Sequence, residues 1–574
     1  MSPRRAWILL AVLNVVVLLP GTLGLDTPAP WLALGLSVDL LSLAALVAWM
    51  ARLGLRKAGA ALGGLVVLAL LVFEIMRLVG VFAMGQDPLL YDLAFLLRHA
   101  VVLLMDIGTL WDWLGVVGVC LLPVLLATGA AWAIHRASPT WGDKAPWLSG
   151  LAVLVFALSF LGRIHPGATR WPARFILPHM VENLSESVRV YRSVTRTQTQ
   201  DPYAQMRLQP LSQAPEVRIF IVESYGELAF TEKGSAEPLR AHLRELEAAL
   251  GEQGWYSLSG RSVAPVSGGR SWIADATLYS GVEVSYESVF QHLKPGFGTN
   301  RTLPAVLHDA GYHTVVVEPK DRARPGVELE NEFNFDQTVF YADLDWQGPE
   351  WGWGLIPDQY TLGWLRENAL APAADRSQPV FLSFHMVASH VPWRSPPPLV
   401  ADWRTLDQEP LAEDHDKAAK RKAATTKRTP DERTEATRRL GRYKREAGMQ
   451  HGGQGSVRDE TLGAYLQLLH YDLEAIAQHL DHETERPTLV IIMGDHQPPF
   501  LSKRMSFSVP VHVLATDPAL LREFESRGFQ PGLVPPDRGP AELSHQAMFS
   551  ALIRSLARYD GQPAPQLHTQ GVKP

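Results

Sequence analysis

The sequence has a single cysteine, Cys120, among 574 residues. One thiol excludes an intramolecular disulfide framework and any site built on a Cys-x-x-Cys motif. The chain also lacks an excess of basic residues, because 53 Lys and Arg stand against 59 Asp and Glu, for a formal net charge of −6. There is therefore no overall electrostatic signature of nucleic-acid binding, and we expect no nucleic-acid partner.

Polar residues are scarce in roughly the first 165 positions, although the apolar content of the whole chain, 47%, is ordinary. Five segments there are long enough to cross about 30 Å of hydrocarbon at about 1.5 Å per residue. A buried bundle in a soluble protein would show polar faces, and a cleaved signal peptide would explain only the first segment. We expect a transmembrane domain of about five helices over residues 1–165. The segments are roughly 6–24, 31–52, 60–84, 110–134 and 146–163.

The distribution of positive charge indicates how these segments are oriented. Basic residues precede the first segment and follow the second and fourth, so all of them fall on the cytoplasmic side. Five crossings then place the C-terminal part outside the cytoplasm. Residues 88–108 are apolar but contain Asp92, Arg98 and His99, so they are either interfacial or re-entrant, and the number of crossings depends on them. The basic residues are Arg4, Arg5, Arg52, Arg56, Lys57, Arg136 and Lys144.

The pattern changes twice after the apolar part. Residues 166–215 are expected to form a juxtamembrane linker, in which RFILPHMVENLSESVRVYRSV has apolar residues at helical spacing suited to a membrane surface. From about residue 216, strand-like runs such as EVRIFIVES, QPVFLSFHM and PTLVIIMGDH alternate with amphipathic helices such as LRAHLRELEAALGEQG. This alternation predicts an α/β domain over residues 216–574 with a mainly parallel central sheet.

A charged stretch at residues 401–458 interrupts the α/β pattern. It holds twelve Lys and Arg residues between Lys417 and Arg445 and almost no apolar residues. We interpret it as a solvated or disordered insertion. A patch for anionic lipid headgroups or an acidic glycan is the alternative.

Three expected strands end in side chains that can bind a metal or a phosphate. Glu223 lies at the end of the strand expected in EVRIFIVES. His385 and His390 lie in VFLSFHMVASH, and Asp495 and His496 end PTLVIIMGDH. In open α/β sheets, ligands bind just outside the carboxyl ends of the strands. Glu, Asp and His are ligands for Zn²⁺ or Mn²⁺, and an open site of this kind activates a nucleophile and offsets phosphoryl charge.

The best candidate for a nucleophile lies in SVAPVSGGRSWIADATLYSG. Two glycines allow close backbone approach, and Ser271 is expected to begin the helix that follows. A hydroxyl at a helix N-terminus lies where backbone N–H groups and the helix dipole favour an anion. Ser271 is therefore the favoured nucleophile, with a simple N-cap role as the alternative and Thr277 and Ser267 in reserve.

These features together resemble the alkaline-phosphatase-like superfamily, which includes the sulfatases. They are a Glu at the first strand end, a hydroxyl after glycines at a helix start, a Ser-His-x-Pro and a late Gly-Asp-His. The closer resemblance is to its membrane-bound branch of lipoteichoic acid synthases, phosphoglycerol transferases and phosphoethanolamine transferases. Membrane spans before an extracytoplasmic catalytic domain are similar to that branch as well. The resemblance covers nearly the whole chain apart from the basic insertion.

The resemblance implies that Glu223, Ser271, Asp495 and His496 are the metal ligands, and that Ser271 is the catalytic residue. The family nucleophile is a threonine, so the serine is a departure that keeps the hydroxyl needed for a covalent phospho-enzyme. In ASHVPW, His390 matches the family histidine that contacts the transferred phosphate.

Five further residues are expected to bind substrate, with structural or surface roles as the alternatives. Trp353 and Asp358 lie in WGWGLIPDQY, a region where the family has substrate-contacting residues. Arg270 and Arg394 could pair with a phosphate. The fifth is His385, whose imidazole lies within an expected strand.

Two absences separate the branches of the superfamily. Sulfatases make formylglycine from a Cys or Ser with Pro or Ala two residues on and Arg four residues on, whereas Ser271 is followed by Ile273 and Asp275 at those positions. Lipid A phosphoethanolamine transferases usually carry several disulfides, which a chain with only Cys120 cannot form. The phosphoglycerol-transferase type is therefore the closer match.

The sequence thus predicts a Zn²⁺- or Mn²⁺-dependent phosphotransferase in a bacterial inner membrane, with its catalytic domain in the periplasm. It would move phosphoglycerol or phosphoethanolamine from a phospholipid donor to a glycan or other envelope acceptor through Ser271. A phosphatase or phosphodiesterase that uses water is the alternative, because both share the first half-reaction. A non-enzymatic membrane protein would be expected to lack a metal ligand, and none is missing.

Overall fold

A computed structural model of the chain divides into two compact units, Met1–Tyr191 and Arg192–Pro574. Each is described by itself below. The boundaries expected from the sequence, at residues 165 and 215, stay a prediction. The structure describes residues 2–23, 35–84, 86–97, 101, 110–164, 173–196, 201–232, 236–323, 329–348, 351, 356–371, 378–391, 393, 395–407, 456–480, 486–499, 506–536, 542–565, 568 and 570–573.

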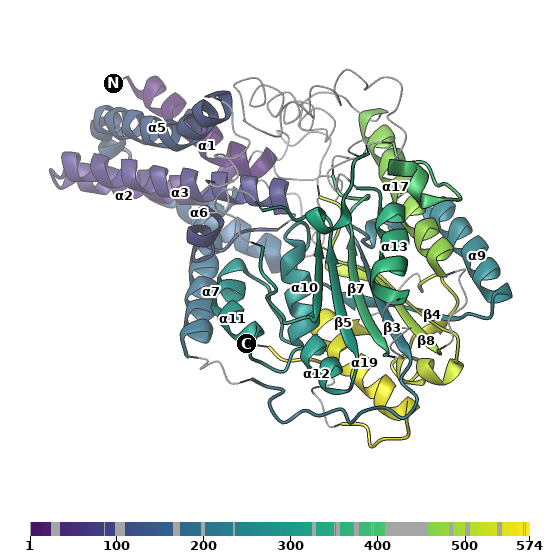
Figure 1. Cartoon of the computed structure of the whole chain (residues 1–574). Coiled ribbons are helices and arrows are strands. Elements are labelled where there is room, and N and C mark those ends of the chain that lie inside the picture. The colour runs from purple at the N-terminus through teal and green to yellow at the C-terminus, as the bar shows by residue number, and fades with distance from the viewer. Residues whose placement is uncertain are drawn as a thin grey trace. The chain divides into compact units, whose positions relative to one another are not determined.

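The first unit is built from helices that follow the apolar segments (Figure 1). Among its described residues, three stretches are long and apolar enough to cross a membrane: Arg4–Leu23, Arg56–Val81 and Trp113–Asp143. This is fewer than the five expected, because α2 has only 15 residues and the apolar stretch Ala145–Ala157 is also short. The helices are α1 (Pro3–Leu23), α2 (Val38–Arg52), α3 (Arg56–Met84), α5 (Leu110–Asp143), α6 (Ala145–Ile164) and α7 (Leu177–Arg196).

Small residues bring α3 and α5 close together. A methyl group added at Gly64 would lie 2.7 Å from the Ala131 Cβ, and one at Gly63 would lie 2.8 Å from Ile134 Cδ1. Close backbone approach of this kind is how helices associate where lipid removes the hydrophobic drive between them.

The second unit contains a nine-stranded sheet in the order β10-β4-β9-β8-β3-β7-β5-β6, with β11 beside β4. Strands β8, β3, β7, β5 and β6 run parallel, whereas β9 is antiparallel to both β8 and β4. The expected mainly parallel centre is therefore confirmed, within a mixed sheet. The strands are β3 (Glu216–Val222), β4 (Tyr256–Val263), β5 (His313–Glu318), β6 (Gln337–Phe340), β7 (Val380–Met386), β8 (Thr488–Gly494), β9 (Ser508–Ala515), β10 (Gln530–Pro531) and β11 (Leu543–Ser544).

Helices cover both faces of this sheet, which explains why its central strands are almost continuously apolar. Helices α9, α13 and α17 lie on one face, and α10, α12 and α19 lie on the other (Figure 1). Apart from the first residue of β3, strands β3, β7 and β8 are buried along their whole length. The helices are α8 (Leu228–Thr231), α9 (Ala236–Glu252), α10 (Ser271–Ser280), α11 (Glu287–Phe297), α12 (Leu303–Asp309), α13 (Asp358–Leu365), α17 (Ser456–Leu480), α18 (Arg522–Glu525) and α19 (His545–Tyr559).

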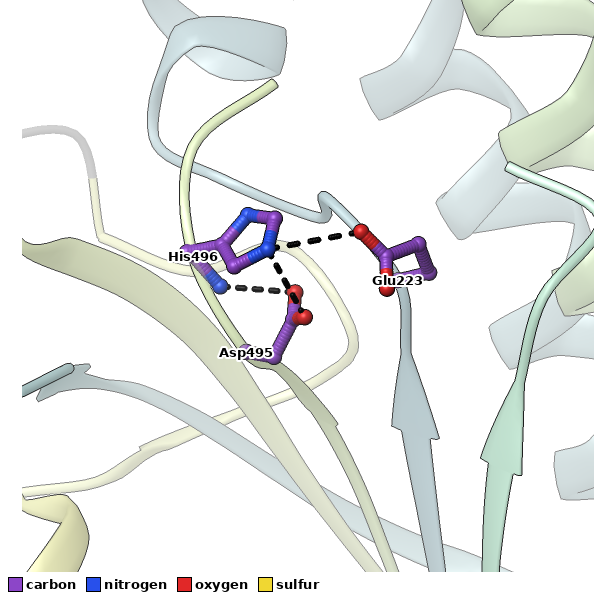
Figure 2. A group of neighbouring side chains, drawn as sticks. All are labelled: Glu223, Asp495 and His496. Atoms are coloured by element: carbon purple, nitrogen blue, oxygen red, sulfur yellow. Dashed lines mark hydrogen bonds and ion pairs between the residues drawn. The ribbon is translucent and has the colours of Figure 1, made fainter. Parts of the chain in front are cut away.

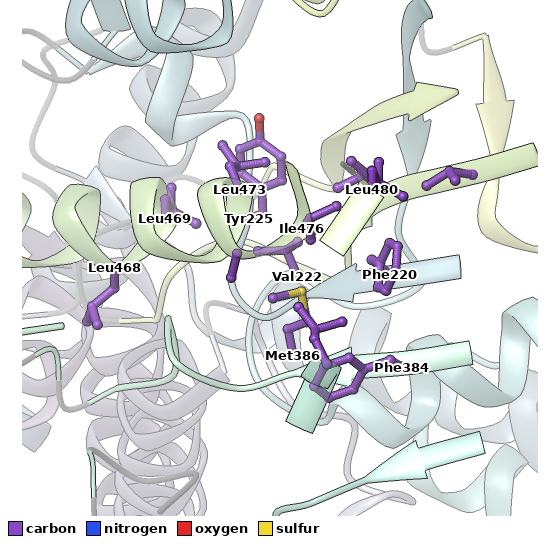
Figure 3. Packing of buried hydrophobic residues seen from close by; sticks show 14 of the residues in the cluster. Phe220, Val222, Tyr225, Phe384, Met386, Leu468, Leu469, Leu473, Ile476 and Leu480 are labelled. Carbon is purple, nitrogen blue, oxygen red and sulfur yellow. The ribbon is translucent and has the colours of Figure 1, made fainter. Parts of the chain in front are cut away.

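Helix α17 supplies much of the core on its face of the sheet. Figure 3 shows apolar side chains of α17, such as Leu473 and Ile476, over Val222 of β3 and Met386 of β7. This helix begins at the C-terminal border of the charged stretch 401–458. Most of that stretch lies outside the described residues, so its interpretation as a solvated insertion stays a prediction.

The tip of β8 passes very close to the chain that leaves β3. A Cβ added at Gly494 would lie 1.8 Å from the carbonyl oxygen of Tyr225, which is backbone and cannot move aside cheaply. Only glycine fits at this crossing, and it brings the residues after β8 beside those after β3.

We expect Gly494→Ala to destabilise the sheet by about 1–3 kcal/mol or more, because the added methyl group overpacks a backbone crossing. The matched control is Gly463→Ala in α17, where an added Cβ meets nothing within 4 Å. That change should be neutral or stabilising by up to about 1 kcal/mol. Hydrogen exchange of peptides from β8 in the full-length protein, detected by mass spectrometry, measures the change in stability in each variant. Equal protection of β8 in the two variants would contradict the argument.

Candidate metal centre

The register of the parallel strands places the candidate ligands side by side. Val222 of β3 pairs with Met386 of β7 and with Gly494 of β8. The next residues, Glu223 and Asp495, therefore leave the sheet at the same edge. Figure 2 shows the side chains of Glu223 and Asp495 converging from the two strand tips, with His496 beside them.

Four side chains of the expected metal site form one buried cluster. The Ser271 hydroxyl donates to Glu223 Oε2 at 2.9 Å, and its oxygen lies 3.3 Å from His496 Nε2. That nitrogen lies 3.4 Å from Glu223 Oε1 and 3.1 Å from Asp495 Oδ2. The sequence elements that supply these residues are far apart, and the fold brings all four together.

The donor atoms fit a divalent cation. Ligand atoms of Glu223, Asp495 and His496 all lie within 4.8 Å of one another, and all three residues are buried. Among the described residues, the buried Asp495 Oδ2 finds no hydrogen-bond partner, which is costly for a carboxylate unless a cation or a proton meets it. Two carboxylates and an imidazole, with a hydroxyl beside them, are a donor set suited to Zn²⁺ or Mn²⁺.

Hydrogen bonds around the cluster orient its donors. Asp495 Oδ1 accepts from the backbone N–H groups of Ser224 and His496, each at 2.7 Å, which leaves Oδ2 for another partner. His496 Nδ1 lies 2.8 Å from the carbonyl oxygen of Gln497. Since a carbonyl can only accept, Nδ1 carries the proton, and the lone pair of Nε2 points into the cluster.

Burial and neighbouring charges shift the pKa values of both acids of the site. Burial and the neighbouring charge of Glu223 raise the pKa of Asp495 to about 6. Burial also raises the pKa of Glu223, but His496, His390 and His385 outweigh this and lower it well below its ordinary value. Ionisation of both acids in this volume is unfavourable, and a bound cation would offset it.

Ser271 is the first residue of α10, as expected from the sequence. The N-cap is Arg270, and the Ser271 side chain donates to Glu223 instead of capping the helix, so the N-cap alternative is wrong. Of the reserve candidates, Thr277 donates its hydroxyl to the carbonyl of Ile273 within α10. Ser267 is buried in the preceding loop, where its carbonyl accepts the N–H of Gln497.

Backbone strain is concentrated at the same place. Ser224, directly after Glu223, has a φ of 59°, and Arg270, directly before Ser271, has a φ of 62°. Left-handed conformations are unfavourable for residues with a side chain and persist only where the surroundings impose them. Each strained residue turns the chain so that its neighbour points into the cluster.

Among the expected substrate-binding residues, His385 lies against the metal cluster. Its Nε2 is 3.4 Å from Glu223 Oε2 and 3.7 Å from Asp495 Oδ2. Its Nδ1 is 3.1 Å from Asp275 Oδ2. Burial lowers the pKa of His385, but Asp275 outweighs this and raises it well above the ordinary value. Sequence reasoning missed Asp275, although its spacing of four residues from Ser271 puts both on one face of α10.

His390 lies in the loop after β7, where its Nδ1 contacts the carbonyl of Val391. Burial lowers its pKa, and the nearby charge of Glu223 only partly offsets this. Arg270 is buried beside Ser271. Trp353 and Arg394 lie outside the described residues, and their substrate roles stay predictions.

Asp358 is fully buried, and its carboxylate accepts the backbone N–H groups of Val387 at 3.1 Å and Ala388 at 2.8 Å. Asp358 thus holds the loop that leads from β7 to His390. Burial raises the pKa of Asp358 to about 6. Asp472 of α17 lies close by, and burial and the charge of Asp358 raise its pKa well above the ordinary value.

Sequence reasoning also missed Lys320, a cationic side chain near the site. Lys320 follows β5, whose tip lies beside that of β7. Burial lowers the pKa of Lys320, but the charges of Glu318, Asp321, Asp275 and Glu223 outweigh this, so the ammonium group stays protonated. Its signal in the sequence was its place at a strand end, in VVVEPK.

The comparisons with known proteins agree with this geometry at the level of the family. Residues 276–515 match the family model described as Sulfatase. The matched residues lie within the second unit. The match includes Asp495 and His496 but begins after Glu223 and Ser271, which the fold brings beside them. The expected resemblance to the alkaline-phosphatase-like superfamily is therefore confirmed, and the candidate spans before the domain make the chain a membrane protein with a C-terminal soluble part.

The similar solved structures named below are distant in sequence, and no curated protein matches the chain. The lipoteichoic acid synthase LtaP from Listeria monocytogenes is 12% identical, with a TM-score of 0.36 over 63% of this chain and 75% of that one. The phosphoglycerol transferase GacH from Streptococcus pyogenes is 12% identical, with a TM-score of 0.35 over 67% and 87%. The C-terminal periplasmic domain of EcEptC from Escherichia coli, in complex with Zn, is 12% identical, with a TM-score of 0.36 over 62% and 86%.

We expect Glu223→Gln and Asp495→Asn each to weaken the binding of Zn²⁺ or Mn²⁺ by at least about tenfold, because each removes a charged donor. Glu252→Gln, at the exposed end of α9, is the matched control and should bind as the wild type does. Isothermal titration of the full-length protein in detergent measures the affinity. In wild type, free metal at about one hundred times Kd should add about 2.7 kcal/mol of stability. Equal affinity in all three variants would refute the assignment.

The buried pair Asp358 and Asp472 predicts a pH dependence of stability. Both folded pKa values lie above the unfolded value of about 4, so their contribution is full below pH 4 and is lost as the pH rises through 6 and above. Asp472→Asn removes one titrating group, so we expect a shallower loss of stability between pH 5 and 8 than in wild type. Urea unfolding at pH 5 and at pH 8 measures this change in the free energy of unfolding. The exposed control Asp402→Asn should keep the wild-type slope, and an unchanged slope in Asp472→Asn would oppose the interpretation.

Proposed function

We propose that the protein is a metal-dependent phosphotransferase that works through a covalent intermediate on Ser271. The observation that carries this proposal is the position of the Ser271 hydroxyl, 2.9 Å from Glu223 Oε2 and 3.3 Å from His496 Nε2. Both atoms belong to the ligand cluster, so the hydroxyl lies where a bound cation would activate it. The sulfatase-family match of residues 276–515 supports an ester-cleaving site at the same strand ends.

The residues of the cluster divide the chemistry between them. Glu223, Asp495, His496 and Ser271 would hold a divalent cation, which when bound supplies Lewis-acid stabilisation of the serine alkoxide and of phosphoryl oxygens. Glu223 Oε2 already accepts the Ser271 proton in a hydrogen bond and is placed to receive it. His390 and Lys320, at neighbouring strand ends, are placed to offset negative charge on the transferred group.

The reaction then has two balanced halves. Ser271 Oγ forms a bond to phosphorus, the bond from phosphorus to the diacylglycerol oxygen breaks, and that oxygen takes a proton. A hydroxyl of the acceptor next forms a bond to phosphorus and gives up its proton, while the bond to Ser271 Oγ breaks and restores the serine. With water as the acceptor, the same steps describe a hydrolase.

The proposed donor is a phospholipid and the proposed acceptor is a glycan or other envelope component. Candidate membrane spans in the same chain support a lipid donor, because they hold the site near a substrate confined to the bilayer. The absence of the formylglycine motif around Ser271 favours phosphoryl over sulfuryl transfer. The transferred group would be phosphoglycerol or phosphoethanolamine, and the positive charges near the spans favour a periplasmic site in a bacterial inner membrane.

The test is the intact mass of the full-length protein after incubation with phosphatidylglycerol or phosphatidylethanolamine and Zn²⁺ or Mn²⁺. We expect an adduct of phosphoglycerol or phosphoethanolamine size on wild type, none on Ser271→Ala, and an adduct on Ser271→Thr. Ser280→Ala, a matched change at the other end of α10, should keep the adduct.

The outcomes separate the alternatives. Products analysed with and without a glycan acceptor distinguish transfer from hydrolysis, because only a hydrolase turns over fully in water. An adduct that persists on Ser271→Ala would move the nucleophile elsewhere. No adduct and no headgroup release with either lipid and either metal would overturn the phospholipid donor.

A further inference from the structure

Helix α7 has a stripe of large apolar side chains that are each more than a third exposed. Its members lie at spacings of four, three, four and three residues, which places them on one side of a helix, and each is between 37% and 58% exposed. In a soluble helix of this amphipathicity, such a side would pack into a core. The stripe consists of Leu177, Val181, Leu184, Val188 and Tyr191.

A different side of α7 packs against the first unit and fixes the rotation of the helix. Asn183 donates to the carbonyl of Pro88 at 2.9 Å and accepts the N–H of Leu90 at 3.0 Å. Ser187 Oγ accepts the N–H of Tyr91 at 3.3 Å. These contacts lie on the side of α7 next to the stripe and fix the direction in which the stripe points.

The start of α7 is attached to the start of α2. The Asp39 carboxylate accepts the N–H groups of Ile176 at 2.7 Å and Leu177 at 3.2 Å. Since Asp39 is in the first turn of α2, one carboxylate serves the N-terminal ends of both helices, where negative charge is favoured. Just before this point, β1 (Leu36–Ser37) pairs with β2 (Ala173–Arg174).

These attachments place α7 at one end of the helix bundle. Residues 88–91, which bind Asn183 and Ser187, follow the C-terminal end of α3, a candidate span. Helix α7 runs across the direction of α2 and α3 instead of along it (Figure 1). A helix that crosses the ends of membrane spans lies in the plane of the bilayer surface.

The polar side of α7 completes an interfacial pattern. At about 100° per residue, His179, Glu182, Glu186 and Arg189 lie roughly opposite the apolar stripe. Tyr191, at the end of the stripe, makes an edge-to-face contact with Tyr91 at 5.5 Å between ring centroids. Tyrosine is enriched at the membrane–water interface, where its ring is buried and its hydroxyl is wet.

We propose that α7 lies in the membrane interface, with its apolar stripe in the lipid and its charged side in water. The lipid is favoured over another occupant because the candidate spans of the same unit also expose large apolar side chains. Helix α3 exposes Leu65, Val72 and Val79 in the same way. The second unit begins at Arg192, directly after the stripe.

The single cysteine makes a direct test possible. In a Cys120→Ser background, one cysteine is introduced at Val181, Leu184 or Val188 on the stripe, or at Glu182 or Arg189 on the polar side, and labelled with a nitroxide. The full-length protein is reconstituted in vesicles of phosphatidylglycerol and phosphatidylethanolamine. Collision of each label with oxygen, which enters hydrocarbon, is compared with collision with a water-soluble nickel complex.

We expect stripe labels to collide preferentially with oxygen and polar-side labels with nickel, alternating with the helical period. Val79→Cys on α3 gives the reference for lipid exposure, and Arg244→Cys on α9 gives the reference for water. Stripe labels shielded from both reagents would mean that the catalytic unit or a second copy covers the stripe, which would overturn the proposal. A preference for nickel along the stripe would overturn it as well.

This proposal does not rest on the proposed reaction. The measurement needs no substrate and no bound metal, so a failed adduct experiment leaves it standing. Conversely, a stripe covered by protein would leave the chemistry at Ser271 untouched.

Discussion

The structure of the site depends on the repulsion between two carboxylates that neighbouring parallel strands bring to one point. Glu223 and Asp495 are buried, and burial together with the charge of Glu223 raises the pKa of Asp495 to about 6. Such a pair is stable only with compensating positive charge. His385, whose pKa is raised well above its ordinary value, and Lys320 supply part of it, and a cation would supply the rest. The carboxyl ends of β3 and β8 therefore form a site that favours a bound cation even without substrate.

The surroundings keep these groups in place at a cost in local backbone energy. The turns at Ser224 and Arg270 adopt left-handed conformations, and Gly494 passes within contact of the Tyr225 backbone. Asp358 holds the loop before His390 through two backbone amides instead of facing solvent. Asp358, which the sequence suggested as a substrate-binding residue, thus contacts the backbone of the loop that carries His390.

The strand ends were predictable because a buried apolar run that stops at Glu, Asp or His marks both the strand and the edge where ligands bind. Glu223, Asp495 and His496 therefore followed from local sequence, and Ser271 followed from the glycines and the helix start after them. Asp275 and Lys320 did not follow, because their importance depends on contacts across the fold: Asp275 matters only once His385 is known to face it. The residues around Trp353 and Arg394 carried no periodic pattern that could place them.

The short α2 shows how an apolar run in the sequence can be longer than the helix found within it. The sequence supports an apolar run over residues 31–52, yet the helix begins only at Val38. The residues before it are held by the side of another helix: Asn14 of α1 donates to the carbonyl of Gly35 and accepts the N–H of Ser37, each at 2.7 Å. Backbone that leaves the helical conformation within a bundle requires such partners. At about 1.5 Å per residue, the 15 residues of α2 reach about 22 Å, less than a hydrocarbon core of about 30 Å. Helix α2 alone is therefore shorter than the hydrocarbon core, and the carboxylate of Asp39 in its first turn accepts N–H groups at the start of α7.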